Sequence, residues 1–312
     1  MDNNLKDMKV LIIGYGSIGK KHYKIIKNNF KNIQIFLLSK RNLFIKGASV
    51  FNTLKEVKNL EFDYVIIASE PHEHFFQLKF FEKNFKNLKI LVEKPLFNKE
   101  KKLQIKNNKI FVGYNLRFHP AIAFLEKFLS KNNPIDIKLI TNSFLPKWRK
   151  KSNHKNYSSD KRRGGGVIFD LSHEIDLALW LFGNIKIEHV KFNKISKLKI
   201  NTEDNLQLIG KIRKSNFFLN LSYYSKNELR NIYLDTTNKS LFIDLRNNII
   251  KKDNKIRKIL SKSHNIDKTY LDLHKAILFD PNNKKLCSIQ DGYKVLQLIT
   301  QIKKNYRTII PK

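Results

Sequence analysis

The residues best suited to chemistry lie in one stretch, G-G-G-V-I-F-D-L-S-H-E-I-D-L-A-L-W-L-F-G, from Gly164 to Gly183. Asp170, His173 and Asp176 recur there at every third position, which keeps them near one face of an α-helix. A carboxylate beside an imidazole tunes a histidine for proton transfer near neutral pH. The same residues also suit a core helix that is capped by an aspartate and carries a half-buried histidine. This stretch alone leaves the catalytic and the structural interpretation open.

The N-terminal residues decide between these interpretations, because they carry a dinucleotide fingerprint. A short buried strand is predicted at 9–13, and it runs into G-Y-G-S-I-G and a helical stretch through Ile26. Strand, G-x-G-x-x-G and helix in immediate succession is the context in which this motif binds a dinucleotide. The glycines admit the pyrophosphate, and the helix N-terminus offers it free N–H groups. We expect cofactor contacts from Gly14, Gly16, Ser17, Ile18 and Gly19.

The end of a second predicted strand, 33–38, indicates which dinucleotide binds. An NAD site commonly places Asp or Glu about 20 residues after the last glycine, where it binds the ribose 2′-hydroxyl. Ser39, Lys40 and Arg41 stand there instead, and they suit the 2′-phosphate of NADP through charge-assisted hydrogen bonds. In so basic a chain, ordinary surface lysine and arginine fit the pattern as well. NADP is therefore the expected cofactor, and NAD is the second choice.

Further buried strands alternate with helices along the first part of the chain. They are predicted at 64–68, 89–92 and 110–113, and they lead into S-E-P-H-E-H, E-K-P-L and Y-N-L-R-F-H-P. This alternation predicts a parallel, doubly wound sheet, which binds its ligands at the carboxyl ends of the strands. The residues at these ends that we expect to face the cofactor are Ser69, His74, Glu93 and Lys94.

Composition limits the class of protein. The 312 residues include 61 Lys and Arg against 27 Asp and Glu, a formal net charge of +34. These cations are spread along the chain without a recognition helix, an RNA-binding signature or zinc spacing, which argues against specific nucleic-acid binding. The single cysteine, Cys287, excludes an internal disulfide. Because the chain lacks a long apolar run and a secretion signal, we expect a cytoplasmic protein with no membrane span, and we expect no metal site.

Taken together, the motifs resemble the Gfo/Idh/MocA oxidoreductases, the family of glucose-fructose oxidoreductase and inositol dehydrogenase. Besides the glycine motif, the resemblance rests on E-K-P at 93–95, G-Y-N-x-R-F at 113–118, G-G-G…D…H…D…W-L-F-G at 164–183 and S-I-Q-D-G-Y at 288–293. Within the family, L-P-x-W-R at 145–149 and D-L-S-H-E-I-D at 170–176 resemble a branch that often serves cell-surface polysaccharide or sugar-nucleotide pathways.

The resemblance implies an α/β chain with two domains. A Rossmann domain with a doubly wound parallel sheet would span 1–118, and an α+β substrate domain with an open, largely antiparallel sheet would span 119–312. The sequence agrees, because β-like runs separated by turn residues follow Pro134 and include 135–144 and 217–224. In the family the outer face of that sheet commonly forms dimers or tetramers, so the resemblance implies a homo-oligomer.

The resemblance also implies roles for site residues. Lys94 would give a proton or hydrogen bond to the substrate oxygen, and His173 would be the main acid/base, with Asp170 orienting His173 or the substrate. Oxidation of a secondary alcohol needs such groups, because the O–H proton must leave as hydride leaves carbon. Arginine suits a phosphate or carboxylate, and tryptophan suits a sugar face or plain packing. The residues expected to face the substrate are Asn115, Arg117, Trp148, Arg149, Tyr157 and Asp176.

One departure from the family pattern concerns Asp170 and His173. The commoner pattern has three residues between them, whereas here only Leu171 and Ser172 intervene. On a regular helix the shorter spacing turns His173 by about 100° relative to Asp170. Direct pairing of the two is therefore less favoured, and Asp176 is the alternative partner of His173.

The leading hypothesis is hydride transfer between a nicotinamide cofactor and a secondary alcohol or ketone of a sugar or sugar nucleotide. Two alternatives stay open. One is a non-catalytic protein of the same fold that senses the nucleotide, and the other is a glycoside hydrolase that uses a tightly held NAD transiently. The presence of both Lys94 and His173 argues against the sensor, which needs no proton relay.

Overall fold

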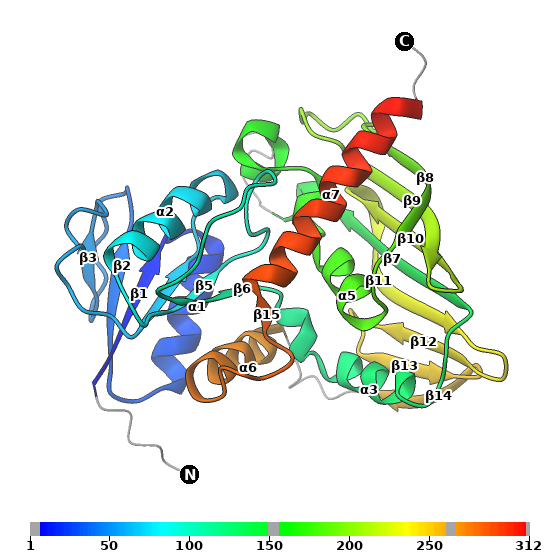
Figure 1. Ribbon diagram of the computed structural model, residues 1–312, viewed down its shortest axis with the longest axis horizontal. Coiled ribbons are helices and arrows are strands. Elements are labelled where there is room, and N and C mark those ends of the chain that lie inside the picture. Colours follow the sequence, from blue (N-terminus) through cyan, green and yellow to red (C-terminus); the bar gives the residue numbers. More distant parts are fainter. Residues whose placement is uncertain (1–6, 149–155, 260–265, 310–312) are drawn as a thin grey trace. The chain divides into compact units, whose positions relative to one another are not determined.

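The computed structural model describes residues 7–148, 156–259 and 266–309, and these divide into two compact units. The described part of the first unit comprises 7–97, 101–115 and 266–293. The second unit comprises 98–100, the described residues between 116 and 259, and the described residues from 294 onward. Figure 1 shows both units and labels most of their helices and strands.

The first unit is built on a seven-stranded sheet in the order β15-β6-β5-β4-β1-β2-β3 (Figure 1). All neighbouring strands are parallel except the edge strand β15 (Cys287–Ser288), which is antiparallel to β6. The other strands are β1 (Met8–Ile13), β2 (Ile33–Leu38), β3 (Ser49–Phe51), β4 (Tyr64–Ile67), β5 (Lys89–Val92) and β6 (Lys109–Val112). The parallel strands spread to both sides of β1, which is the doubly wound arrangement that the alternating pattern predicted.

The apolar strands of this sheet form the core of the first unit. Val10, Leu11 and Ile12 of β1 have no exposed surface, and every residue of β4 is buried. Such continuous apolar runs are typical of parallel strands that helices cover on both faces. The helices of the unit are α1 (Ser17–Asn29), α2 (Pro71–Asn84) and α6 (Ile266–Phe279).

Residues 266–293 return to the first unit, which the expected division into 1–118 and 119–312 did not include. Helix α6 packs against α1, and β15 pairs with β6. No element at 266–279 was predicted from the sequence, and a helical period would in any case identify only the buried face of a helix and not the element it contacts. The first unit also ends earlier than expected at its other boundary, at Asn115.

The second unit contains an eight-stranded sheet in the order β14-β13-β12-β11-β7-β10-β9-β8. Neighbouring strands are antiparallel except β7 and β10, which are parallel. Along β7 buried and partly exposed side chains alternate, so the sheet packs one face against the core. The strands are β7 (Asp136–Phe144), β8 (Lys186–Asn193), β9 (Asn205–Ile212), β10 (Ser215–Ser222), β11 (Tyr224–Asp235), β12 (Ser240–Asp244), β13 (Ile249–Lys252) and β14 (Lys255–Ile259). The expected fold class is confirmed.

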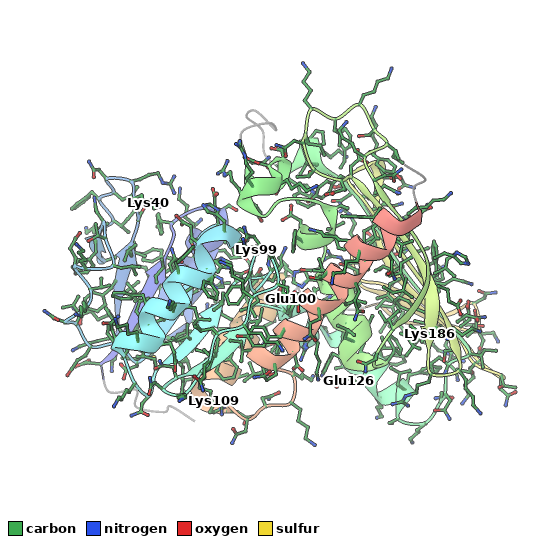
Figure 2. The ribbon with its side chains drawn as sticks, turned by 45° about the horizontal axis from the view of Figure 1, so that its top comes forward. Lys40, Lys99, Glu100, Lys109, Glu126 and Lys186 are labelled. Carbon is green, nitrogen blue, oxygen red and sulfur yellow. The ribbon has the colours of Figure 1, made fainter. Side chains whose placement is uncertain are left out.

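The helices of the second unit are α3 (Pro120–Leu129), α4 (Val167–Asp170), α5 (His173–Leu181) and most of α7 (Ile289–Ile309). Helix α4 packs on β9 and β10, and its four residues are all buried. Exposed lysines such as Lys40, Lys109 and Lys186 point outward from different elements, so the charge is spread over the surface as it is spread along the sequence (Figure 2).

Candidate active site

The glycine turn between β1 and α1 is closed by steric contacts at its two ends. Gly14 has a φ of 88°, and a Cβ there would lie 2.7 Å from the Ala68 carbonyl oxygen. A Cβ on Gly19 would lie 1.9 Å from the Gly14 carbonyl oxygen. Both positions therefore require glycine. This geometry brings the strand, the turn and the helix as close together as the dinucleotide fingerprint demands.

The middle of the turn is open. No atom of the described chain lies within 4 Å of a Cβ placed on Gly16, and both Gly16 and Ser17 are exposed. Gly16 is the N-cap of α1, and no side chain in the described chain caps the helix through it. The first N–H groups of α1 therefore face an accessible surface, which suits a pyrophosphate. The turn fits the cofactor that the sequence implied.

The polar residues after β2 lie beside the glycine turn. The Arg41 Nη2 atom donates a hydrogen bond to the Tyr15 carbonyl oxygen at 2.6 Å, and Tyr15 stands inside the glycine motif. Ser39 is buried, and its hydroxyl oxygen accepts the Arg41 N–H at 3.2 Å. The Lys40 side chain is 79% exposed and pairs with Glu73. These contacts hold Arg41 near the expected cofactor, while its preference for a 2′-phosphate stays a prediction.

Lys94 follows β5 in a turn that contains a cis Lys94–Pro95 peptide bond. On one side, the Glu93 carboxylate accepts the Lys94 backbone N–H at 3.2 Å. Gly113 leaves room for this carboxylate, because a Cβ there would lie 2.9 Å from Glu93 Oε1. Lys94 is thus placed at the carboxyl end of a parallel strand, where α/β sheets bind their ligands.

His74 holds the other side of the same turn. It has no exposed surface, and its Nδ1 atom lies 3.1 Å from the Pro95 carbonyl oxygen and 3.2 Å from that of Leu96. Its Nε2 atom lies 3.1 Å from the Ser69 carbonyl oxygen. Burial lowers the pKa of His74, against the opposing effect of these carbonyl groups, so the ring is neutral at pH 7. Ser69 and His74 therefore shape the Lys94 turn, and their expected contact with the cofactor stays a prediction.

The stretch Gly164–Gly183 forms two helices, so the expectation of one regular helix is wrong. Helix α4 ends at Asp170 and α5 begins at His173, with Leu171 and Ser172 between them. Before α4, Gly164 and Gly166 have positive φ values of 88° and 120°. Because the helix breaks between Asp170 and His173, the rotation calculated for a regular helix does not describe this pair.

Asp170 is engaged by a residue that the sequence analysis missed. The buried Tyr223 hydroxyl donates a hydrogen bond to Asp170 Oδ2. Burial raises the pKa of Tyr223 well above its ordinary value, and the charge of Asp170 raises it further, so the phenol keeps its proton. The edge of the Trp148 ring contacts Tyr223 with ring centroids 5.4 Å apart, and Trp148 Nε1 donates to Ser143 Oγ at 2.9 Å. Tyr223 lies within the β-like run at 217–224 with no motif around it, so no sequence signal marked it.

Asp176 is engaged by Arg117. Arg117 Nε donates to Asp176 Oδ2 at 2.9 Å, and Nη2 donates to Oδ1 at 2.6 Å. Both side chains are 2% exposed, and the guanidinium lies 5.0 Å from the centre of the Trp180 ring. A bidentate ion pair of this kind fixes the Arg117 segment to α5. The expected contact of Arg117 and Asp176 with substrate stays a prediction.

His173 is buried at the first position of α5, which its neighbour Glu174 anchors to the sheet. Glu174 Oε1 accepts hydrogen bonds from Thr141 Oγ1 at 2.7 Å and from Arg230 Nε at 2.8 Å. These contacts fix the start of α5 and with it the backbone of His173. Lys94 belongs to the first unit and His173 to the second, and their shared role as a proton relay stays a prediction.

The other expected substrate residues have different surroundings. Asn115 Nδ2 donates to Thr269 Oγ1 of α6 at 2.6 Å inside the first unit. Tyr157 is half-buried and begins a short 3-10 helix, Tyr157–Ser159. Arg149 lies outside the described residues. Within the described ranges, no group of three or more His, Cys, Asp or Glu residues could hold a metal ion, and no helix has the length and apolar character of a membrane span.

Family models match both parts of the chain. The model of the oxidoreductase family with an NAD-binding Rossmann fold matches residues 8–106, and that of its C-terminal alpha/beta domain matches residues 133–243. The chain belongs to the Gfo/Idh/MocA oxidoreductase family. The resemblance inferred from the motifs is confirmed, and the first unit of this Gfo/Idh/MocA protein is its NAD-binding Rossmann domain.

Solved structures of similar fold cover nearly the whole chain. The WlbA dehydrogenase from Bordetella pertussis, solved with NADH and UDP-GlcNAcA, is 14% identical with a TM-score of 0.79, covering 98% of this chain and 97% of its own. The UDP-N-acetylglucosamine 3-dehydrogenase GnnA from Acidithiobacillus ferrooxidans is 16% identical with a TM-score of 0.72, covering 96% and 98%. Levoglucosan dehydrogenase, solved with NADH and levoglucosan, is 15% identical with a TM-score of 0.79, covering 96% and 97%. At these identities the likeness establishes the fold, and no curated protein matches the chain.

Proposed function

We propose that the chain is a cytoplasmic, NAD(P)-dependent dehydrogenase or reductase that acts on a secondary alcohol or ketone of a sugar nucleotide. The observation that carries this proposal is the placement of Lys94. It lies at the carboxyl end of β5, between the Glu93 carboxylate and the His74 ring, in the unit that carries the glycine turn. Support for the substrate class comes from WlbA and GnnA, whose names and ligands are those of sugar-nucleotide enzymes.

The reaction converts a CH–OH group and oxidised nicotinamide into a C=O group, reduced nicotinamide and a proton. The bound nicotinamide would supply the hydride acceptor or donor. The chain's own residues would manage the proton on the reacting oxygen: Lys94 through its amine and His173 through its imidazole. Asp170, the last residue of α4, would orient the substrate or His173, while its Oδ2 atom accepts the hydrogen bond from Tyr223.

We also propose NADP as the preferred cofactor, with NAD as the second choice. One guanidinium nitrogen of Arg41 donates to the Tyr15 carbonyl oxygen, and a guanidinium carries five N–H donors in all. Donors therefore remain for a 2′-phosphate at the end of β2, and Arg41 already lies beside the glycine turn. The Ser39 hydroxyl adjoins it in the same segment.

A homo-oligomer, dimer or tetramer, completes the proposal. The second unit's sheet carries partly exposed apolar side chains, such as Ile209 of β9, which is 48% exposed. Light scattering of the purified protein during size-exclusion chromatography measures the mass directly. A single chain mass at micromolar concentration would contradict this part of the proposal.

The experiment that tests the activity is a substrate panel. The purified protein is mixed with oxidised NADP or NAD and with each of a set of UDP- and GDP-sugars, and the absorbance of the reduced nicotinamide is followed. We expect a rise with at least one sugar nucleotide. Cofactor binding without turnover of any sugar would favour the sensor, and release of a free sugar without net absorbance change would favour the NAD-dependent hydrolase.

A further inference from the structure

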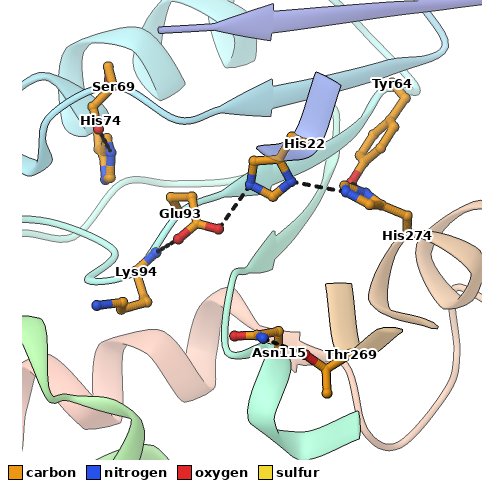
Figure 3. Close-up of polar contacts among 9 residues, drawn as sticks. All are labelled: His22, Tyr64, Ser69, His74, Glu93, Lys94, Asn115, Thr269 and His274. Atoms are coloured by element: carbon orange, nitrogen blue, oxygen red, sulfur yellow. Dashed lines mark hydrogen bonds and ion pairs between the residues drawn. The ribbon is translucent and has the colours of Figure 1, made fainter. Parts of the chain in front are cut away.

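A chain of four polar side chains crosses the core of the first unit and ends at the Lys94 turn (Figure 3). The Tyr64 hydroxyl lies 2.9 Å from His274 Nδ1, and His274 Nε2 lies 3.0 Å from His22 Nδ1. His22 Nε2 then lies 3.0 Å from Glu93 Oε1. Tyr64, His22 and His274 have no exposed surface, and Glu93 is 4% exposed. These four residues are called the buried chain below.

The hydrogen bonds of the buried chain have one consistent direction. The Glu93 carboxylate only accepts, so His22 Nε2 donates to it. In this direction the neutral His274 ring carries its single N–H group on Nε2 and donates it to His22 Nδ1. His274 in turn accepts at Nδ1, and the Tyr64 hydroxyl donates to it. Each N–H and O–H group is used once, and every step points toward Glu93.

The ionisation of the two members farthest from Glu93, His274 and Tyr64, agrees with this direction. Burial lowers the pKa of His274 well below its ordinary value, and His22 lowers it further, so the ring is neutral and can accept at Nδ1. Burial raises the pKa of Tyr64 well above its ordinary value, with the charge of Glu93 adding to the effect, so the hydroxyl keeps the proton that it donates. In this direction the donors of Tyr64, His274 and His22 all point toward the Glu93 carboxylate.

Three members of the buried chain, Tyr64, His274 and His22, have no exposed surface, and only Glu93 reaches toward the site. The function of the buried chain must lie at its Glu93 end, where the second carboxylate oxygen accepts the Lys94 N–H at 3.2 Å. Helix α6, which supplies His274, also holds Asn115 through Thr269 at 2.6 Å. One helix thus supports the two turns that follow β5 and β6, as Figure 3 shows.

We propose that Tyr64, His274 and His22 are positioning residues for Lys94, acting through Glu93. The donors fix the plane of the Glu93 carboxylate, and this carboxylate fixes the backbone at the start of the Lys94–Pro95 turn. Burying three polar side chains in an apolar core carries a desolvation penalty that apolar side chains of similar size would not have. Positioning of Lys94 accounts for these three polar residues. The expected effect on turnover rests on the function proposed above, whereas the effect on Lys94 itself does not.

The first test replaces Tyr64 with phenylalanine, which removes only the donor at the far end of the buried chain. The matched control is Tyr293→Phe, because that tyrosine is also buried in the first unit and its hydroxyl bonds the Leu103 N–H at 2.9 Å and carbonyl oxygen at 3.1 Å. The substrate-independent readout is trace acetylation of the Lys94 amine, followed by peptide mass spectrometry. The exposed Lys186 amine, which belongs to the second unit, serves as the internal reference in the same sample.

We expect Tyr64→Phe to change the acetylation rate of Lys94 relative to Lys186, and Tyr293→Phe to leave this ratio unchanged. With a sugar nucleotide that is turned over, Tyr64→Phe should lower kcat by roughly 10-fold with nearly constant KM, because the reacting group is misplaced rather than lost. Tyr293→Phe should cost at least as much thermal stability as Tyr64→Phe, since its hydroxyl makes two hydrogen bonds with Leu103. An unchanged Lys94 ratio in Tyr64→Phe would overturn the proposal.

Two further measurements keep the proposal falsifiable if Tyr64→Phe does not fold. His274→Gln retains a donor and an acceptor and should preserve the Lys94 ratio, whereas His274→Leu should change it. Nitrogen NMR of the histidine-labelled wild-type protein should show His22 and His274 protonated at Nε2 and bare at Nδ1. A proton on Nδ1 of either ring would overturn the proposal. A changed Lys94 ratio without turnover of any sugar nucleotide would support the positioning role and contradict the proposed function.

Discussion

The two catalytic candidates are supported in different ways. Around Lys94, the supporting side chains form one linked series, Tyr64–His274–His22–Glu93, with a single carboxylate at its end. Around His173, the acidic residues contact several different side chains: Asp170 contacts Tyr223, Asp176 contacts Arg117, and Glu174 contacts Thr141 and Arg230. A change at one end of the linked series should therefore reach Lys94, whereas a change in one of these contacts should stay local.

The largest expected effect is the loss of either candidate itself. Lys94→Ala and His173→Ala should each reduce turnover by roughly 10²–10⁴-fold, the usual contribution of a positioned acid or base. Cofactor binding should stay nearly intact, because the glycine turn is the expected main contact of the nucleotide. Asp170→Asn should cost less than His173→Ala, since Asp170 engages Tyr223.

The double variant sharpens this prediction. Lys94→Ala combined with His173→Ala should lose less than the product of the two single losses, because residues that act as a unit are not additive. Steady-state kinetics at saturating cofactor measures all three variants. Full turnover in His173→Ala would show that α5 is scaffold and that the second unit supplies no acid or base.

Breaking the buried ion pair between Arg117 and Asp176 should cause the largest loss of stability that we predict for the second unit. Asp176→Asn leaves the buried Arg117 guanidinium without its charged partner and should reduce the free energy of unfolding by about 3–5 kcal/mol. The matched control is Asp272→Asn, which removes a partly exposed helical pair with Lys268 and should cost no more than about 0.5 kcal/mol. Urea titration measures both. Equal losses in the two variants would contradict the buried pair's importance.

Acid should weaken the first unit through its neutral histidines. Burial holds the pKa values of His74 and His274 below their ordinary value of 6.5, so the unfolded chain binds protons there before the native chain does. Their contribution to stability is complete above about pH 6.5 and falls as the pH drops toward the folded pKa values, by up to about 1.4 kcal/mol per pH unit for each ring.

Hydrogen exchange at pH 7 and pH 5 tests whether the first unit loses stability in acid more than the second unit does. Amides of β4 and β5 should lose more protection than those of β7 and β10 as the pH falls. His274→Leu should flatten the pH dependence in the first unit. A steeper loss in the second unit would contradict the assignment.

The smallest expected effect concerns cofactor choice. Binding titration should favour NADPH over NADH, and Arg41→Ala should narrow that gap by roughly 10-fold, the worth of a charge-assisted contact. Lys40→Ala is the control, because its exposed side chain pairs with Glu73, and it should change the ratio less. Tighter binding of NADH by the unmodified protein would show that the serine and the two cations after β2 do not select the phosphate.

The sequence was sufficient for the fold because its signals are local. The strands expected at 33–38 and 89–92 coincide with β2 and β5, since short apolar runs bounded by turn residues specify them without distant partners. The glycine fingerprint is equally local, because a positive φ at Gly14 and the close approach at Gly19 are properties of single positions. These features place the two candidate turns without any tertiary information.

The partners of buried polar groups could not be predicted in the same way. His22 lies on the buried face of α1 with Gly19, Tyr23 and Ile26, so its burial was detectable as a polar residue within an apolar stripe. Its contact with His274 depends on how α6 packs, and periodicity specifies a face but not a partner. The break between α4 and α5 was missed for a related reason, because the spacing of Asp170, His173 and Asp176 fits a continuous helix equally well.

The central claim is that this chain transfers hydride to or from the carbon of a sugar nucleotide, and isotopic labelling tests it most directly. A responsive sugar nucleotide from the panel is prepared with deuterium on the carbon that carries the reacting hydroxyl and is incubated with oxidised cofactor. Mass spectrometry should find that deuterium on the reduced nicotinamide and a ketone at the labelled carbon of the sugar. A reduced nicotinamide free of deuterium, or a sugar that keeps it, would contradict the account.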